Sequence, residues 1–177
     1  MEPELRQAIQ DYITYLAANS SSMRNAGARG VVHAAQTYLR QLSLADFAVH
    51  TEAQFRTLLD AHTIQLRDTF PDGAQNNWGA ARKVLNIFLR DSVYHRLLCE
   101  HYRLHQLERW LEIPLDQHVA SHLRKHAAQP LPWPGICRVT PELNAAYQHV
   151  ATEVAGEHEP RIWRDYFWWR NPFRAEP

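Results

Sequence analysis

One lysine and one aspartate stand out in this sequence because each lies where a helix is expected to begin. Lys83 follows the turn Asn77-Trp78-Gly79-Ala80-Ala81-Arg82, and Asp116 follows Pro114. The first backbone N–H groups of a helix carry partial positive charge, which disfavours a second cation and stabilises an anion. We therefore expect Lys83 to supply a partly neutral amine, which is a nucleophile, and Asp116 to remain ionised. An ionised carboxylate stabilises a developing cation or accepts a proton from a nucleophile.

The turn before Lys83 is also a candidate site for a phosphate group. Backbone N–H groups near Gly79 and Ala81, together with the guanidinium of Arg82, attract an anion at a helix start. Simpler explanations exist for both candidate catalytic residues: Lys83 fits a solvated lysine in the first turn of a helix, and Asp116 fits an ordinary N-cap. The joint occurrence of the two motifs in one chain favours the catalytic interpretation.

Two motifs in this region resemble the helix–hairpin–helix superfamily of DNA glycosylases. The turn W-G-A-A-R-K-V-L-N resembles the hairpin motif L-P-G-V-G-R-K-x-A, and P-L-D-Q-H-V-A resembles the P-V-D-x-H-V stretch that follows it. The resemblance covers about residues 70–127, and Ala81 stands where the hairpin has its second glycine. It implies that Lys83 is the lysine of bifunctional members and that Asp116 is the catalytic aspartate. It also implies that Gly79, Ala81 and Arg82 bind DNA.

The 33-residue separation between Lys83 and Asp116 is similar to that of archaeal 8-oxoguanine glycosylases. It is also compatible with bacterial phage-defence glycosylases that remove glucosylated hydroxymethylcytosine from viral DNA. The implied reaction is cleavage of the N-glycosidic bond of a modified base in DNA, without a cofactor. Attack by Lys83 gives a Schiff base and possible strand cleavage (AP lyase activity), whereas attack by water gives a plain abasic site. The sequence leaves both outcomes open.

The target nucleotide has to leave the base stack to reach such a site, so the resemblance implies a pocket for an extruded base. Trp133, Trp78 and His118 are the candidate residues of this pocket. Trp133, between two prolines, fits either a rigid aromatic wall or a loop anchor in the core. His118 and His122 have the four-residue spacing of zinc ligands on one helix face, but no acidic residue lies between them. We expect no metal site.

The elements that must position these residues are helical almost throughout. Apolar residues recur at three- and four-residue spacing, and period-two strand patterns are absent, so we expect an all-α fold of the glycosylase type in a single domain over 1–177. The expected helices cover about 3–18, 29–41, 51–70, 81–103, 104–111, a segment that Asp116 caps, a segment from 140 and 160–170. The proline-rich segment 130–135 is expected to be an extended linker.

Composition limits the class of protein further. Hydrophobic residues make up 45% of the 177 residues, which supports a globular core, and no apolar run approaches the ~18 residues of a membrane span. The start of the chain is acidic and polar, and the two cysteines, Cys99 and Cys137, fit free thiols in a reducing compartment. We expect a cytoplasmic, monomeric protein with no membrane partner.

The net charge of zero, with 19 basic and 19 acidic residues, predicts modest nonspecific affinity for DNA. Two rival classes remain open at this point. One is a non-catalytic helical module that uses the hairpin to hold a nucleic-acid backbone. The other is an interaction protein in which both motifs only mark helix boundaries and the aromatic segment 161–170 docks a partner.

Overall fold

The computed structural model describes residues 1–170, and helices account for most of them. The α-helices are α1 (Pro3–Ala17), α2 (Val31–Gln41), α3 (Glu52–Asp68), α4 (Trp78–Tyr94), α5 (Arg96–Tyr102), α6 (Gln117–His126), α7 (Pro141–Ala155) and α8 (Trp163–Arg170). Three short 3-10 helices complete the set: η1 (Leu44–Phe47), η2 (His105–Arg109) and η3 (Ile136–Arg138). No strand occurs in this part of the chain, which confirms the all-α prediction.

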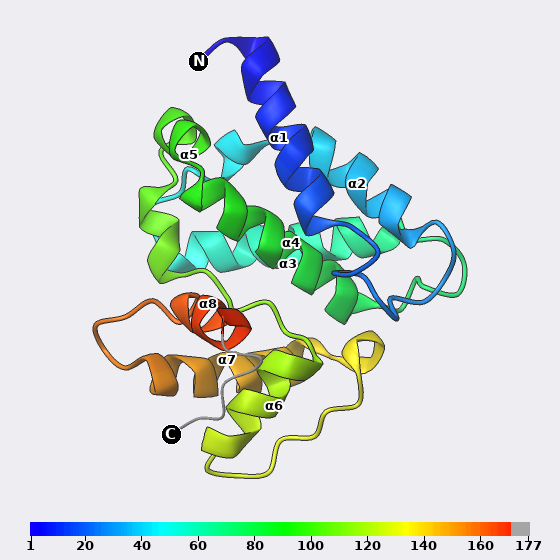
Figure 1. Ribbon diagram of the computed structural model, residues 1–177, viewed down its shortest axis with the longest axis vertical. Coiled ribbons are helices and arrows are strands. Elements are labelled where there is room, and N and C mark those ends of the chain that lie inside the picture. The colour runs from blue at the N-terminus through cyan, green and yellow to red at the C-terminus, as the bar shows by residue number, and fades with distance from the viewer. Residues whose placement is uncertain (171–177) are drawn as a thin grey trace.

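The helices form two lobes, each with its own group of buried apolar side chains (Figure 1). The upper lobe contains α1–α5 with η1 and η2, and its core includes Phe47, Phe55 and Phe88. The lower lobe contains α6–α8 with η3, and its core includes Val119 and Tyr147. Residues 110–116 connect the lobes and are called the linker below.

The middle helix of the upper lobe, α4, is the element on which the rest of that lobe packs. It contacts α1, α2 and α3, and it also reaches η3 and α7 of the lower lobe. Most of its side chains are buried, because apolar residues occur on several faces rather than on one stripe. A helix surrounded in this way has little freedom to shift, so residues on α4 are held firmly.

Side-chain caps define where several of the helices begin. The Thr51 hydroxyl accepts a hydrogen bond from the backbone N–H of Gln54 at the start of α3, as the sequence predicts. The Asn77 side chain caps α4 through Ala80 N–H in the same manner. Thr140 caps α7, where Pro141 occupies the first helical position. Such caps satisfy backbone donors that have no partner inside the helix.

The prediction of one continuous helix over 81–103 is wrong. The helix begins three residues earlier, at Trp78, and breaks at His95, whose φ and ψ of −82° and 103° are extended. Val93 before the break and Leu98 after it both lie in the upper-lobe core. The apolar spacing continues across the break because α4 and α5 face the same core, and spacing alone therefore does not reveal it.

The helices of residues 1–170 fall short of the combination of length and apolar character that crossing a bilayer requires.

Candidate active site

The structure brings Lys83 of α4 and Asp116 of the linker together. Lys83 Nζ lies 3.4 Å from Asp116 Oδ2, and the two side chains keep 12% and 17% of their surface exposed. The pair therefore lies at the bottom of a depression rather than on the open surface or in a sealed interior. A partly desolvated ion pair of this kind can exchange a proton and still meet a ligand.

The two carboxylate oxygens of Asp116 have different partners. Oδ1 accepts hydrogen bonds from the backbone N–H groups of His118 and Val119, both at 2.9 Å, and so caps α6. Oδ2 faces the ammonium group of Lys83. The cap fixes the plane of the carboxylate at the start of α6.

Two cavities meet at this pair. The first, of about 370 Å³, has Lys83, Asp116, Arg90 and Asp165 in its wall and is called the Asp165 chamber. The second, of about 500 Å³, has Lys83 and Asp116 in its wall together with Trp133, and is called the Trp133 chamber. Lys83 and Asp116 thus lie where the two chambers adjoin, and a ligand in either chamber reaches them. The two chambers together are called the cleft.

Asp165 of α8 is a site residue that the sequence analysis did not single out. Its side chain is 3% exposed, and Oδ2 accepts a hydrogen bond from the Arg90 guanidinium of α4. Among the described residues, Oδ1 has no hydrogen-bond partner although it is buried. Burial, reinforced by the nearby Asp116 charge, raises the pKa of Asp165 to about 6 despite the opposing charge of Arg90. Asp165 thus brings to the wall of the chamber a carboxylate of which one oxygen is buried without a hydrogen-bond partner in residues 1–170.

Tyr166 forms another part of the wall of the Asp165 chamber. Its ring lies 5.3 Å beneath the Arg90 guanidinium carbon and edge-on to the Tyr94 ring at 5.7 Å. These contacts join α8 of the lower lobe to α4 of the upper lobe. Asp165 and Tyr166 lie next to each other in the chain, and Asp165 lies 75 residues beyond Arg90. No short motif therefore signals this side of the site.

Two of the three predicted base-pocket residues line the Trp133 chamber. Trp133 lies in the proline-rich segment, half-buried, with its ring edge-on to the Tyr147 ring at 5.9 Å. His118 lies on the first turn of α6, and its Nε2 is 3.0 Å from the carbonyl oxygen of Trp168. Both residues therefore face the chamber that Lys83 and Asp116 share.

Trp78 does not line the cleft, contrary to the expectation for a base-pocket residue. It is 8% exposed and lies in the wall of a separate cavity of about 380 Å³, with the Arg82 guanidinium carbon 5.2 Å above its ring. Its position in the first turn of α4 points it toward the lower-lobe core, where it packs with Val139 and Tyr147.

Arg82, Gly79 and Ala81 are buried, so their side chains do not form the DNA-binding surface that the hairpin resemblance implies. The Arg82 side chain is 5% exposed and forms a two-point ion pair with Glu112, with a further bond to Asp60. Ala81 is fully buried, and a Cβ added to Gly79 would lie 2.2 Å from the carbonyl oxygen of Ile136. Gly79 permits close packing of α4 against η3.

Glu112, in the linker, is the centre of a buried polar network that the sequence analysis missed. It accepts hydrogen bonds from Arg82, from Asn86 of α4 and from Asn144 of α7. Burial opposes ionisation of Glu112, but these bonds and the Arg82 charge outweigh it and lower the pKa to about 2. The network joins both lobes to the linker at Glu112. This residue directly precedes Ile113 and lies four residues before Asp116.

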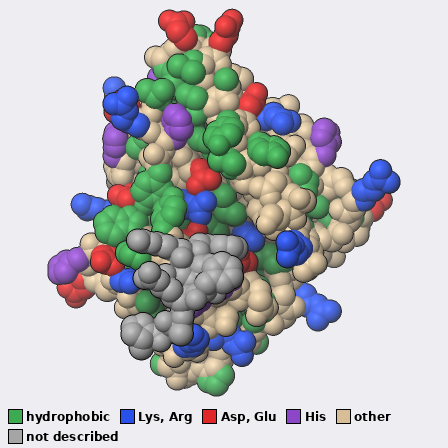
Figure 2. Space-filling view, viewed as in Figure 1, with side chains coloured by type: hydrophobic (Ala, Val, Ile, Leu, Met, Phe, Trp, Pro, Cys, Tyr) green, Lys and Arg blue, Asp and Glu red, His purple; other side chains and the backbone are tan. Residues whose placement is uncertain are grey.

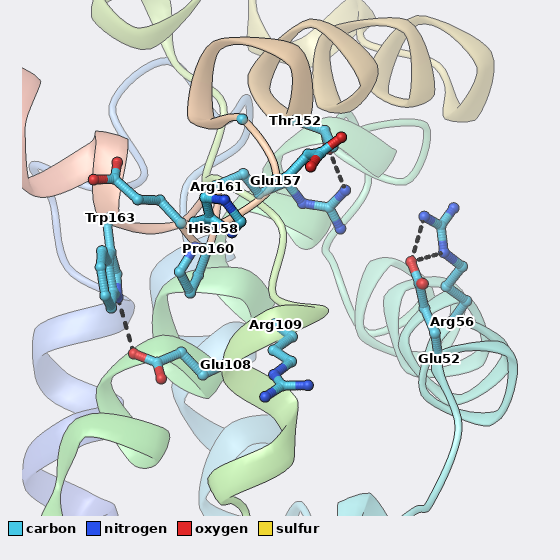
Figure 3. Close-up of a pocket in the computed structure, with 12 residues that line it drawn as sticks. Glu52, Arg56, Glu108, Arg109, Thr152, Glu157, His158, Pro160, Arg161 and Trp163 are labelled. Carbon is cyan, nitrogen blue, oxygen red and sulfur yellow. Dashed lines mark hydrogen bonds and ion pairs between the residues drawn. The ribbon is translucent and has the colours of Figure 1, made fainter.

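A larger cavity of about 750 Å³ lies elsewhere, between the start of α3 and the segment before α8 (Figure 3). Figure 3 shows Arg161 pointing toward Thr152 and Trp163 bonded to Glu108 on its walls. Neither Lys83 nor Asp116 lines this cavity. This cavity is therefore larger than either chamber but separate from the candidate site.

Figure 2 shows Lys and Arg side chains spread over both lobes on the face in view rather than gathered in one patch. This distribution agrees with the net charge of zero. Within residues 1–170, no group of three or more His, Cys, Asp and Glu side chains is arranged to hold a metal ion.

No protein-family model matches the chain, and neither a curated protein nor a solved structure is similar enough to count as a match.

Proposed function

We propose that the protein is a DNA glycosylase with the helix–hairpin–helix type of fold that cleaves the N-glycosidic bond of a modified base. Lys83 and Asp116 are its catalytic residues. The observation that carries the proposal is the 3.4 Å contact between Lys83 Nζ and Asp116 Oδ2 at the bottom of an open cleft. Residues 33 positions apart, whose types suit the reaction, thus meet in a cavity.

The reaction follows from the chemistry of the pair. As the N-glycosidic bond breaks, the base leaves with the bonding electrons, and the ionised carboxylate of Asp116 stabilises the positive charge that develops on the sugar. A proton then passes from the Lys83 ammonium through Asp116 to the departing base, which restores the carboxylate and leaves a neutral amine. The lone pair of this amine forms the new bond to C1′ of the deoxyribose. If water attacks instead, the same carboxylate accepts the proton of the water.

The Asp165 chamber suits a nucleobase. Its apolar wall includes Ile87 and Tyr166, which can pack against a flat ring, and Arg90 and Asp165 supply polar groups beside them. Burial of the ring against these apolar side chains would favour an extruded base over water in this chamber.

The Trp133 chamber suits a bulky polar substituent on that base. Asn25, Gln117 and His118 provide polar side chains around it, and Trp133 provides an aromatic surface. Amides beside an aromatic ring are suited to a hexose, because hydroxyl groups need hydrogen bonds and the ring carbons present an apolar face. We therefore propose glucosylated hydroxymethylcytosine in phage DNA as the substrate and anti-phage defence in the cytoplasm as the role of this monomeric enzyme.

A second candidate is an 8-oxoguanine repair glycosylase with AP lyase activity. The observation that favours it is the Lys83 amine at the floor of the cleft, where attack on C1′ leads to a Schiff base. The two candidates differ in the base released and in the fate of the covalent intermediate.

The test is incubation of the protein with DNA duplexes that contain glucosylated hydroxymethylcytosine, 8-oxoguanine or only unmodified bases. We expect alkali-sensitive abasic sites in one of the modified duplexes and none with Asp116→Asn. Borohydride should trap a covalent adduct if Lys83 is the nucleophile, and Lys83→Ala should abolish it. Lys125→Ala is the matched control, because Lys125 is the only other lysine in the chain.

Base release that persists in Asp116→Asn would contradict the proposed mechanism. Binding to these duplexes without base release by the wild-type protein would instead support the non-catalytic nucleic-acid-binding module. A trapped adduct lost in Lys125→Ala but not in Lys83→Ala would show that the nucleophile had been misassigned.

A further inference from the structure

The linker is held by side chains rather than by secondary structure. Arg161, just before α8, donates hydrogen bonds from Nε to the Leu111 carbonyl and from Nη2 to the Trp110 carbonyl, both at 2.9 Å. The next residue, Glu112, is bonded to Arg82, Asn86 and Asn144. An extended segment has no internal hydrogen bonds, so these side-chain contacts decide where it lies.

Gln148 of α7 holds the following residue, Ile113, at both of its backbone polar groups. Gln148 Oε1 accepts a hydrogen bond from the Ile113 N–H at 3.0 Å, and Nε2 donates one to the Ile113 carbonyl at 2.9 Å. The side-chain amide thus pairs with the linker as a neighbouring strand would. Gln148 is 4% exposed and Ile113 is fully buried, so water does not compete for these bonds.

Little freedom remains between Ile113 and Asp116. Pro114 has a fixed φ, and the Leu115 side chain is 3% exposed in the lower-lobe core. Asp116 is then bound to the backbone of α6 by its cap. A displacement of Ile113 is therefore passed on to the carboxylate of Asp116.

Lys83, the other member of the ion pair with Asp116, is held in place through α4. Lys83 follows Arg82 on α4, and Arg82 is tied to Glu112 in the same linker. The distance between Lys83 Nζ and Asp116 Oδ2 therefore depends on two connections: Arg82 with Glu112 on the α4 side, and Gln148 with Ile113 on the α7 side.

We propose that Gln148 is a positioning residue for the proposed reaction, because its amide bonds to Ile113 keep Asp116 opposite Lys83. The catalytic consequence rests on the proposed function, whereas the structural consequence does not. Gln148 touches neither chamber of the cleft and acts only through the linker. Its substitution should slow base release without weakening the binding of DNA.

The test compares Gln148→Met with Gln10→Met. Gln10 of α1 is also a buried glutamine, 5% exposed, whose amide donates to the carbonyls of Leu39 and Leu42 in the upper lobe. Both variants lose buried amide hydrogen bonds and keep a side chain of similar length, so we expect similar losses of thermal stability. Only Gln148→Met changes the linker.

Three quantities are measured in both variants. We expect the single-turnover rate of base release to fall roughly 10- to 100-fold in Gln148→Met and to stay within about twofold in Gln10→Met. The Kd for the DNA substrate should change by less than about threefold in each. Hydrogen exchange of the backbone amides of Ile113, His118 and Val119 should accelerate at least about tenfold in Gln148→Met alone, because the first loses its acceptor and the other two report on the Asp116 cap.

Equal loss of rate in the two variants, or unchanged exchange at His118 and Val119 in Gln148→Met, would overturn the assignment. If Gln148→Met does not fold, Gln148→Glu replaces it, because the carboxylate keeps the acceptor for Ile113 N–H and loses only the donor. The rate of base release and the exchange of His118 and Val119 then decide, with the same expected outcomes, whereas exchange of Ile113 is no longer a readout. A wild-type protein that releases no base would contradict the proposed function, while the exchange measurement would still decide whether Gln148 holds Asp116 in place.

Discussion

At the scale of single residues, Asp116 serves two purposes with two different oxygens. Oδ1 caps α6, whereas Oδ2 faces Lys83. The two roles can be separated because asparagine keeps an oxygen for the cap but lacks the negative charge, and alanine lacks both.

We predict that Asp116→Asn and Asp116→Ala both lose base release by at least about 100-fold, since each lacks the carboxylate opposite Lys83. Their free energies of unfolding should differ: the alanine variant should be less stable than the asparagine variant by about 1 kcal/mol, the usual contribution of an N-cap. Urea titration and single-turnover assays measure the two effects. Equal stability of the variants would show that the cap contributes nothing.

Asp165 makes stability depend on pH in a direction that is unusual for an aspartate. Its pKa is raised from 3.8 to about 6, chiefly by burial, so the folded protein favours the protonated form. The stabilisation is complete below about pH 4 and is lost as the pH rises through 6, a change of about 3 kcal/mol.

We predict that Asp165→Asn removes this loss. The free energy of unfolding of the wild type should fall relative to that of Asp165→Asn as the pH rises from 4 to 7. Denaturant titrations at several pH values give the difference between the two proteins. A difference that stays constant over this range would mean that Asp165 has an ordinary aspartate pKa in the folded state.

The sequence identifies some site residues and misses others for a physical reason. Lys83 and Asp116 could be singled out because their types and local turns are visible in short motifs. Arg82 was expected at a DNA surface, but its burial depends on Glu112, 30 residues later in the chain. Neighbours on a helix point about 100° apart, and local sequence does not say which of Arg82 and Lys83 faces the cleft.

No sequence motif marks Asp165 or Gln148 as a site residue. An aspartate in the first turn of a helix is ordinary, and its importance comes from Arg90, which lies 75 residues earlier. A glutamine on a helix is equally ordinary, and Gln148 is distinguished only by its contact with the Ile113 backbone. Such roles follow from tertiary contacts.

At the scale of the elements, Gly79 marks the closest approach of two segments. A Cβ at this position would lie 2.2 Å from the Ile136 carbonyl oxygen and 2.8 Å from Val139 Cβ, both on the segment that carries η3. Gly79 lies in α4 with an ordinary helical backbone, since the positive φ values belong to the other glycines. The reason for a glycine here is space, not conformation.

We predict that Gly79→Ala destabilises the protein by about 1–3 kcal/mol, the range for overpacking of a close contact. The sign of this change in stability is informative, because alanine in a helix is otherwise more favourable than glycine by about 1 kcal/mol. Thermal or denaturant unfolding measures the change, and Ala53→Gly at an exposed position of α3 gives the propensity effect alone. A stabilised Gly79→Ala protein would contradict the packing shown here.

The helices themselves were largely predictable. Apolar spacing places α1, α2 and α3 close to their observed positions, and the capping residues Thr51, Asp116 and Thr140 mark the starts of α3, α6 and α7. The break at His95 was not predictable, because the residues around it tolerate a helix and the apolar spacing continues into α5. Which helices of the two lobes contact each other could not be predicted from the sequence either, because these contacts depend on buried polar interactions such as those of Glu112.

At the scale of the whole molecule, the balanced charge bears on the proposed binding of DNA. With 19 basic and 19 acidic residues and no single basic patch on the face shown in Figure 2, few phosphates can be neutralised at once. Arg24 is an exposed arginine in the wall of the Trp133 chamber, where it can meet a phosphate of DNA whose extruded nucleotide enters the cleft.

We predict a shallow dependence of DNA affinity on salt, and we expect Arg24→Gln to reduce the slope of log K against log salt concentration by about 1. Arg96→Gln is the matched control, because Arg96 is an exposed arginine on α5 that lines no chamber of the cleft. Binding of a duplex at several salt concentrations measures both slopes. Identical slopes for the two variants would place the DNA elsewhere.

The ion pair between Arg90 and Asp165 has a consequence for the order in which the site comes into being during translation. A ribosome produces Lys83 and Arg90 well before Asp116, and Asp165 follows only after a further 49 residues. The wall of the Asp165 chamber is therefore incomplete in any nascent chain that has not yet released α8 from the exit tunnel. The site can therefore form only late in synthesis, after α8 has left the ribosome.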